Sequence, residues 1–75
     1  MIERELAEMF TNYCERQLKD AKRCQARRDK DSVEHCFTMA YGALMFLESN
    51  FKVYDILAPI WDKYWDEFTE ITRGI

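Results

Sequence analysis

Glycine and proline are scarce in this sequence, since Gly42, Gly74 and Pro59 are the only examples among 75 residues. Sandwiches and barrels need many glycine- and proline-rich turns between short strands, so this scarcity argues against an all-β fold. A second domain would need roughly fifty residues of its own. We therefore expect residues 1–75 to form one all-α domain.

Long apolar runs are also missing. The longest stretch without formal charge covers residues 35–47, which is shorter than the roughly twenty residues that span a bilayer. The first ten residues include Glu3, Arg4, Glu5 and Glu8, where a secretory signal would have a basic start and an apolar run. We expect a cytoplasmic protein without a membrane span.

Cysteine and histidine are too few for most metal or nucleophile chemistry. Cys14, Cys24 and Cys36 form an odd set without close spacing, which argues against a disulfide framework. Cys14 and Cys24 would lie about 15 Å apart on one helix and cannot share a metal ion. His35 is the only histidine. We expect reduced, mostly buried thiols, no metal, no cofactor and no enzyme activity.

What the sequence does contain is apolar residues at helical spacing. This period covers residues 2–28 and predicts a first helix there. Asp31 with Glu34 resembles a capping box and predicts the start of a second helix. A third helix either begins at Pro59 or is kinked by it. The prediction is an antiparallel three-helix bundle, whose second helix buries Val33, Cys36, Phe37, Ala40, Leu44 and Leu47.

Gly42 lies among small residues in the middle of the second helix, between Ala40 and Ala43. A glycine there costs about 1 kcal/mol relative to alanine. Close approach of another backbone would offset that cost, so we expect Gly42→Leu to overpack the contact and destabilise the fold by about 1 to 3 kcal/mol.

The second and third helices have more apolar surface than one small bundle can cover. Eleven residues are aromatic, and residues 33–47 are apolar on more than one side. An isologous homodimer would bury this excess. We expect a non-enzymatic interaction or assembly module that self-associates, with Trp65→Glu favouring the monomer. The candidate interface residues are Ala40, Gly42, Ala43, Trp61 and Trp65.

A basic segment at residues 19–30 suggests an alternative function. Its six cations and two carboxylates leave a local charge of +4, and phosphates favour such a patch. A nucleic-acid-associated regulator would use Lys19, Lys22, Arg23, Arg27 and Arg28. In an up-down-up bundle, however, we expect Arg23 and Arg27 to face acidic residues of the third helix, namely Asp66, Glu67 and Glu70, so nucleic-acid binding is not our first expectation.

Two smaller candidates complete the survey. Asp62, Asp66 and Glu70 recur at four-residue spacing; such carboxylate rows can hold divalent ions, but here they continue the polar face opposite the apolar stripe. A small-molecule or enzyme site near Tyr13, His35 and Tyr41 is the third functional hypothesis.

The Asp20–Ala21 pair and the segment Ala40-Tyr41-Gly42-Ala43-Leu44 resemble a small, mostly archaeal family of helical-hairpin proteins of unknown function. That family has a tyrosine ahead of an Asp-Ala pair, a Gly-Asp turn and a second helix like Tyr-Ala-His-Gly-Leu-Leu-Asp. Tyr41 stands where the family often has histidine, Met45 or a neighbour replaces its acidic residue, and Asp29-Lys30-Asp31 replaces its Gly-Asp turn. The resemblance covers roughly residues 13–47 and implies a spectrin-repeat-like three-helix bundle without a known activity. The corresponding positions are Tyr13, Asp20, Ala21, Asp31, Ala40, Gly42 and Leu44.

Overall fold

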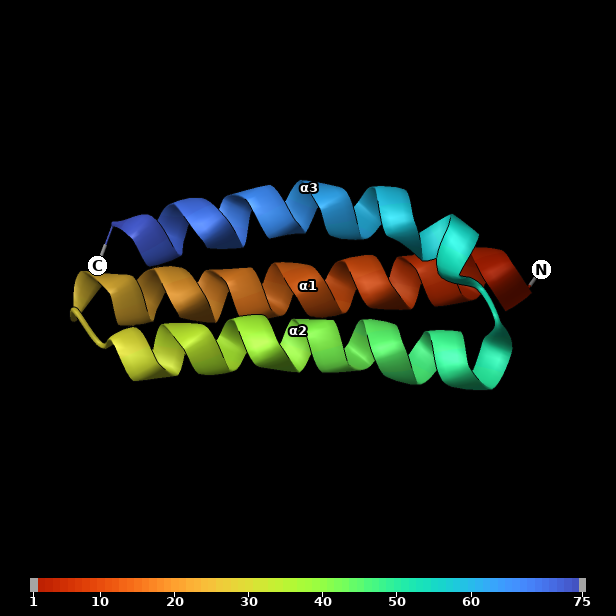
Figure 1. The fold of residues 1–75 in the computed structure, drawn as a ribbon, viewed down its shortest axis with the longest axis horizontal. Helices are drawn as coiled ribbons and strands as arrows, with labels where there is room; N and C mark the ends of the chain where they lie inside the picture. Colours follow the sequence, from red (N-terminus) through yellow and green to blue (C-terminus); the bar gives the residue numbers. More distant parts are fainter. Residues whose placement is uncertain (1, 75) are drawn as a thin grey trace.

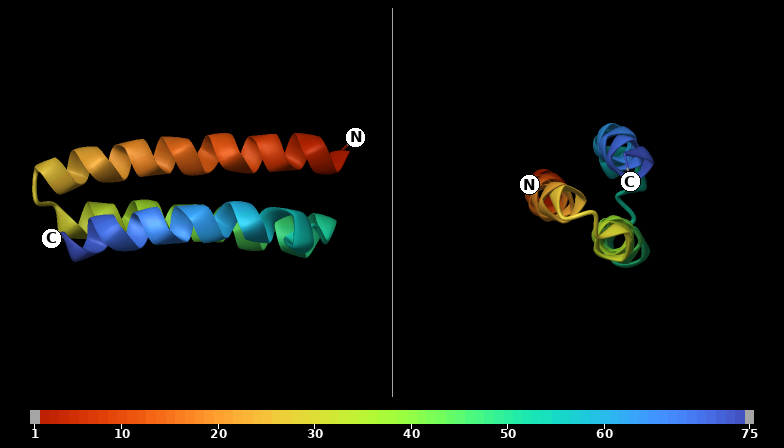
Figure 2. Two further views of the ribbon diagram at one scale, coloured as in Figure 1. Left: turned by 90° about the horizontal axis from the view of Figure 1, so that it is seen from above. Right: turned by 90° about the vertical axis from the view of Figure 1, so that its left-hand side faces the viewer.

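A computed structural model describes residues 2–74 as three antiparallel helices. They are α1 (Ile2–Ala26), α2 (Lys30–Phe51) and α3 (Tyr54–Arg73). The chain runs up, down and up, so the C-terminal ends of α1 and α3 lie at the same end of the bundle (Figure 1). An end-on view shows the three helices at the corners of a triangle, with every helix beside the other two (Figure 2). The predicted all-α three-helix bundle is confirmed.

The core consists of one apolar stripe from each helix. Of the six residues predicted to line the α2 stripe, Phe37 is partly buried and the other five are buried. Burial of such stripes supplies most of the stability of helices in proteins. The largest fully buried side chains are Tyr64, Phe10, Phe68, Leu44, Leu57, Val33 and Cys14.

The first turn corrects the predicted cap of α2. Helix α1 ends at Ala26 rather than Arg28, and Arg28 adopts the left-handed conformation at φ 58°. The N-cap of α2 is Asp29, two residues before the predicted Asp31. The Asp29 carboxylate accepts hydrogen bonds from the Ser32 backbone N–H at 3.2 Å and from the Ser32 hydroxyl at 2.6 Å. Because Asp29 satisfies this end of the helix, Asp31 lies inside its first turn.

The second turn is short, and of the two predicted roles of Pro59 it favours the one inside a longer helix. Helix α2 continues to Phe51, and Lys52 closes it in the left-handed conformation while its N–H donates to the Glu48 carbonyl at 2.9 Å. Helix α3 begins at Tyr54, so Pro59 lies within it and does not start it. Proline has no N–H for the carbonyl of Asp55, one turn earlier. The first turn of α3 is offset from the rest of the helix, as a proline kink produces (Figure 1).

Gly42 does not sit against another backbone of the chain. The residue is exposed, and no heavy atom outside its own helical turn lies within 4 Å of the position that a Cβ would occupy. The expected close contact is therefore wrong, and so is the overpacking expected for Gly42→Leu. Gly42 lies on the outward side of α2, where space is open.

Within residues 2–74, no helix combines the length and the apolar character that crossing a bilayer would require.

We predict that Gly42→Ala stabilises the fold by about 0.5 to 1 kcal/mol, because alanine removes the entropic cost of an exposed mid-helix glycine and meets no neighbour. Urea unfolding followed by circular dichroism measures the change. Gly74→Ala is the control, since its Cβ would lie 2.6 Å from the Gln25 side-chain nitrogen and should give no such gain. Destabilisation by Gly42→Ala would show that a hidden contact requires the glycine.

We also predict that Asp29→Ala lowers the free energy of unfolding by about 0.5 to 2 kcal/mol, through loss of the α2 cap. The hydrogen bonds from Ser32 lower the pKa of Asp29 below its ordinary value of 3.8. The stability that the charged cap adds is therefore complete above that value and is lost as pH falls through the lowered pKa. Asp29→Asn should keep most of the cap and lose this pH dependence. Equal unfolding curves for wild type and Asp29→Ala would contradict the assignment.

Candidate interaction surfaces

The residues predicted to form one interface do not share a surface. Ala40 is fully buried and Trp61 is 6% exposed, so both belong to the chain's own core and cannot contact a partner. Ala43 is partly buried and lines a groove between α1 and α2. Trp65 is half exposed and lines a groove between α2 and α3. The sequence predicted an apolar excess on α2 correctly, but the fold divides it between two grooves.

The groove between α1 and α2, called here the α1–α2 groove, has a volume of about 370 Å³. The buried side chains of Phe10 and Leu47 contribute to its lining. Met9 and Phe46 also line it and are 60% and 62% exposed, so the groove has an exposed apolar patch, as interaction surfaces do. Its complete lining is Met9, Phe10, Asn12, Tyr13, Arg16, Ala43, Phe46 and Leu47.

The α1 helix bears separated charges along the outward side of this groove. Glu5 and Glu8 lie in its N-terminal half, and Arg16 and Lys19 lie in its C-terminal half. All four are exposed, as is Asn12 between them. Spacings of four and seven residues place them on one side of a helix. We call Glu5, Glu8, Asn12, Arg16 and Lys19 the charge-split face of α1.

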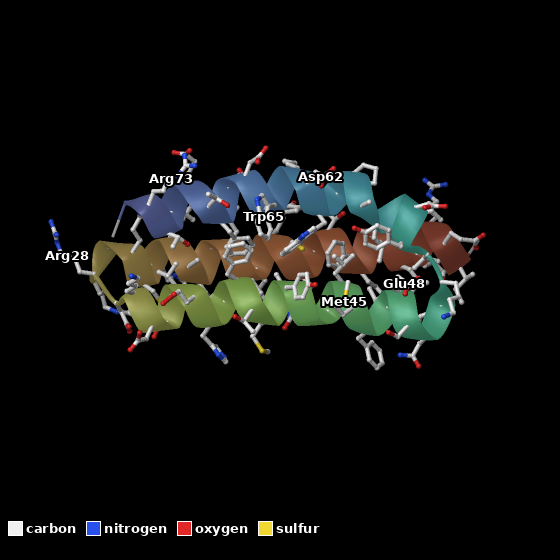
Figure 3. All side chains as sticks on the ribbon, viewed as in Figure 1. Arg28, Met45, Glu48, Asp62, Trp65 and Arg73 are labelled. Atoms are coloured by element: carbon white, nitrogen blue, oxygen red, sulfur yellow. The ribbon has the colours of Figure 1, made fainter. Side chains whose placement is uncertain are left out.

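A second groove, between α2 and α3, is built from aromatic rings. Figure 3 looks onto it, with Trp65 projecting from α3 and Met45 from α2. The rings of Phe37 and Trp65 meet edge to face, with centroids 5.2 Å apart and planes at 73°. Trp61 lies between two exposed rings, with its centroid 5.9 Å from Tyr41 and 6.1 Å from Trp65. We call Phe37, Tyr41, Trp61 and Trp65 the aromatic cluster.

The predicted basic segment is exposed, but its expected neutralisation by α3 is wrong. Each ion pair found within residues 2–74 joins two residues of one helix. Arg23 pairs with Asp20 at 3.4 Å, and Glu70 pairs with Arg73 at 3.3 Å. The guanidinium of Arg27 donates to the sulfur of Cys24 at 3.4 Å. None of these pairs joins Arg23 or Arg27 to the acidic residues of α3.

The third hypothesis, a small-molecule site, joins residues that the fold separates. Tyr13 lines the α1–α2 groove, whereas Tyr41 lines the groove on the other side of α2. His35 is exposed. Asp62, Asp66 and Glu70 are exposed as the polar-face interpretation predicted, and no group of three or more His, Cys, Asp or Glu side chains in residues 2–74 is arranged to hold a metal ion.

The groups whose pKa values are raised lie in the core rather than in the grooves. Burial, with a smaller contribution from Glu15, raises the pKa of the Cys14 thiol to about 12. Burial also raises the pKa of Cys36, with Cys24 and Asp20 adding to the effect. All three cysteines are buried and unpaired, as predicted. Thiols with raised pKa values stay protonated at neutral pH and make poor nucleophiles.

Tyr64 joins the core to the surface of α1. Its side chain is 1% exposed, and its hydroxyl donates a hydrogen bond to the Glu15 carboxylate. Burial and this hydrogen bond raise the pKa of Tyr64, so the phenol stays neutral. Buried tyrosines normally find such a partner, and this contact fixes α3 against α1.

Sequence reasoning missed the α1–α2 groove. Met9 and Tyr13 belong to the helical period of residues 2–28, and they lie beside the buried stripe that contains Phe10. The four-residue spacing of Met9 and Tyr13 indicates that they share one side of a helix. Only the tertiary structure shows that Phe46 of α2 borders this side and that the three residues line one groove.

Comparisons of the chain with family models, with curated proteins and with solved structures found no match. The resemblance to the archaeal hairpin family therefore stays a prediction. Function has to be inferred from the grooves and charges of the bundle itself.

Proposed function

We propose that this protein is a non-enzymatic assembly module that forms a homodimer through the α1–α2 groove. The observation that carries the proposal is the charge-split face of α1 beside the exposed Met9 and Phe46. An isologous contact uses the same surface on both copies. The surface must therefore complement itself in both shape and charge, and this one does so when two α1 helices cross antiparallel at Asn12.

The charges match in this arrangement because they are placed symmetrically about Asn12. Glu5 and Lys19 each lie seven residues from Asn12, about 10.5 Å along the helix. Glu8 and Arg16 each lie four residues from it, about 6 Å. Glu5 of one copy then faces Lys19 of the second, and Glu8 faces Arg16. A two-fold axis repeats each pair, so four pairs of opposite charge form.

The apolar residues supply the other part of the contact. Met9 and Phe46 lie beside the charged row and would lose their exposure to water, which favours association. The bundle measures 40 × 17 × 16 Å, so a contact along one long face approaches the roughly 800 Å² that each partner contributes to a standard interface. The Arg4–Glu8 pair that Glu8 would leave is 3.9 Å long and highly exposed, and such pairs contribute little.

We predict that single charge reversals weaken the dimer and that the matched double reversal restores it. Arg16→Glu would face Glu8 of the second copy, and Glu8→Lys would face Arg16. Each single variant should raise the dissociation constant by about twofold to thirtyfold, since exposed pairs contribute about 0.2 to 1 kcal/mol each and two are inverted. The double variant again places opposite charges together. Sedimentation equilibrium at several protein concentrations measures the dissociation constants of the wild type, the two single variants and the double variant.

Lys63→Glu is the control, because this exposed cation lies on α3 away from the groove and its reversal should leave the dissociation constant unchanged. Trp65→Glu, which the sequence predicted to dissociate the dimer, also lies outside the α1–α2 groove and should leave a dimer of this kind intact. A monomeric wild type would contradict self-association. A dimer that Trp65→Glu dissociates and the charge reversals do not would instead favour the groove between α2 and α3.

A second candidate function, nucleic-acid binding, is favoured by one observation. Lys19, Lys22, Arg27 and Arg28 are exposed and make no ion pair with any residue from 2 to 74, because the expected pairing with α3 does not occur there. Clustered cations of this kind bind phosphates. We rank this function second because the chain has a net charge of −3 and no aromatic residue lies within residues 19–30 to stack on bases.

We predict no measurable binding of a short DNA duplex or single-stranded RNA near 150 mM salt, measured by fluorescence anisotropy. Any binding at low salt should vanish steeply as salt rises. Binding that persists at 150 mM and is lost when Lys22, Arg27 and Arg28 are replaced by glutamine would favour the second candidate.

A further inference from the structure

The aromatic cluster has a geometry that simple core packing does not require. Trp61 is buried, and the rings of Tyr41 and Trp65, which are 47% and 48% exposed, both pack against it. The planes of these two rings are inclined to Trp61 by 51° and 68°. Phe37 adds a partly buried third side, with its centroid 5.9 Å from Trp61. The result is an open pocket of about 390 Å³, lined by Phe37, Thr38, Tyr41 and Trp65.

An exposed aromatic ring attracts a cation with its negative π face, whereas its edge is positive. A cation within about 6 Å of a ring centroid is attracted by the ring quadrupole, most strongly by tryptophan. A quaternary ammonium group suits such a place because its charge is spread over methyl groups that also contact the rings. We propose that the aromatic cluster binds a quaternary ammonium group.

The surroundings of the pocket favour a positive ligand over a neutral or negative one. No lysine or arginine lines the pocket. Asp66 follows Trp65 directly in the sequence and Asp62 lies three residues before it, and both are exposed on α3. Glu34 is exposed one turn before Thr38 on α2. The Thr38 hydroxyl donates a hydrogen bond to the Glu34 carbonyl at 2.9 Å, so it is not a free donor for a neutral or anionic ligand. Acidic residues near an aromatic pocket raise the local concentration of cations.

This site is separate from the proposed dimer contact. The aromatic cluster lies between α2 and α3, and the α1–α2 groove lies on the other side of α2. A monomer and a dimer would therefore present the same aromatic pocket, and the proposal does not depend on self-association.

The test is a titration of the full-length protein with choline and with its neutral carbon isostere, 3,3-dimethylbutan-1-ol. The two probes have nearly the same shape, so a difference in affinity reports the charge. We expect choline to bind at least about fivefold more tightly, as a cation–π contribution predicts. Isothermal titration calorimetry gives the affinities, and tryptophan fluorescence locates the change, since Trp65 is the exposed tryptophan.

Variants locate the site. Trp65→Leu and Tyr41→Leu remove rings that are half exposed, so the bundle should still fold, as circular dichroism can verify. Each should weaken choline binding by about fivefold or more while leaving the isostere little changed. Tyr54→Leu is the matched control, because this aromatic is 45% exposed and lines neither the aromatic pocket nor the α1–α2 groove.

Two results would overturn the proposal: equal binding of choline and its isostere, or no choline binding at concentrations on the order of 100 mM. A second titration distinguishes the sources of the ligand group. Tighter binding of Nα-acetyl-trimethyllysine amide than of choline would indicate a methylated lysine of a protein. The reverse order would indicate a free small-molecule ligand.

Discussion

The bundle depends on the burial of one apolar stripe from each helix against the other two. Phe10, Leu44 and Phe68 come from three different helices, and each is at most 1% exposed. With no more than 75 residues, the chain has a small core, and large side chains must supply most of the buried area. Tyr64 lies at the edge of this core: its ring is buried, and its hydroxyl donates a hydrogen bond to the carboxylate of the exposed Glu15.

The small size of the core also explains why α2 contributes to both proposed interaction surfaces. Its stripe from Val33 to Leu47 is enough to hold it against α1 and α3, yet neighbouring positions are apolar as well. A helix in a three-helix bundle has two flanks, each forming a groove with one neighbour. Phe46 therefore faces the α1–α2 groove, and Tyr41 faces the groove with α3. One excess of apolar side chains becomes two separate surfaces.

The neighbouring helices give the two grooves different electrostatic character. Helix α1 carries carboxylates in its N-terminal half and cations in its C-terminal half. This arrangement supports the proposed pairing of its groove with a second copy. Helix α3 brings tryptophans with carboxylates beside them, which favours a cationic ligand. Both interpretations rest on exposed residues that make few contacts within the chain, such as Arg16 and Trp65. Combined, the two proposals describe a dimer with a ligand pocket on each copy.

The sequence by itself determined the all-α class, the number of helices and the buried face of α2, because helical periodicity and the near absence of glycine and proline are local properties. It placed the α2 cap at Asp31 because the Asp29–Ser32 hydrogen bonds depend on the left-handed turn at Arg28. Only the tertiary structure decided that Trp61 is core while Trp65 is exposed, and that Gly42 faces open space. Periodicity identifies which residues share a side of a helix, but the position of the neighbouring helices decides which of those sides is covered.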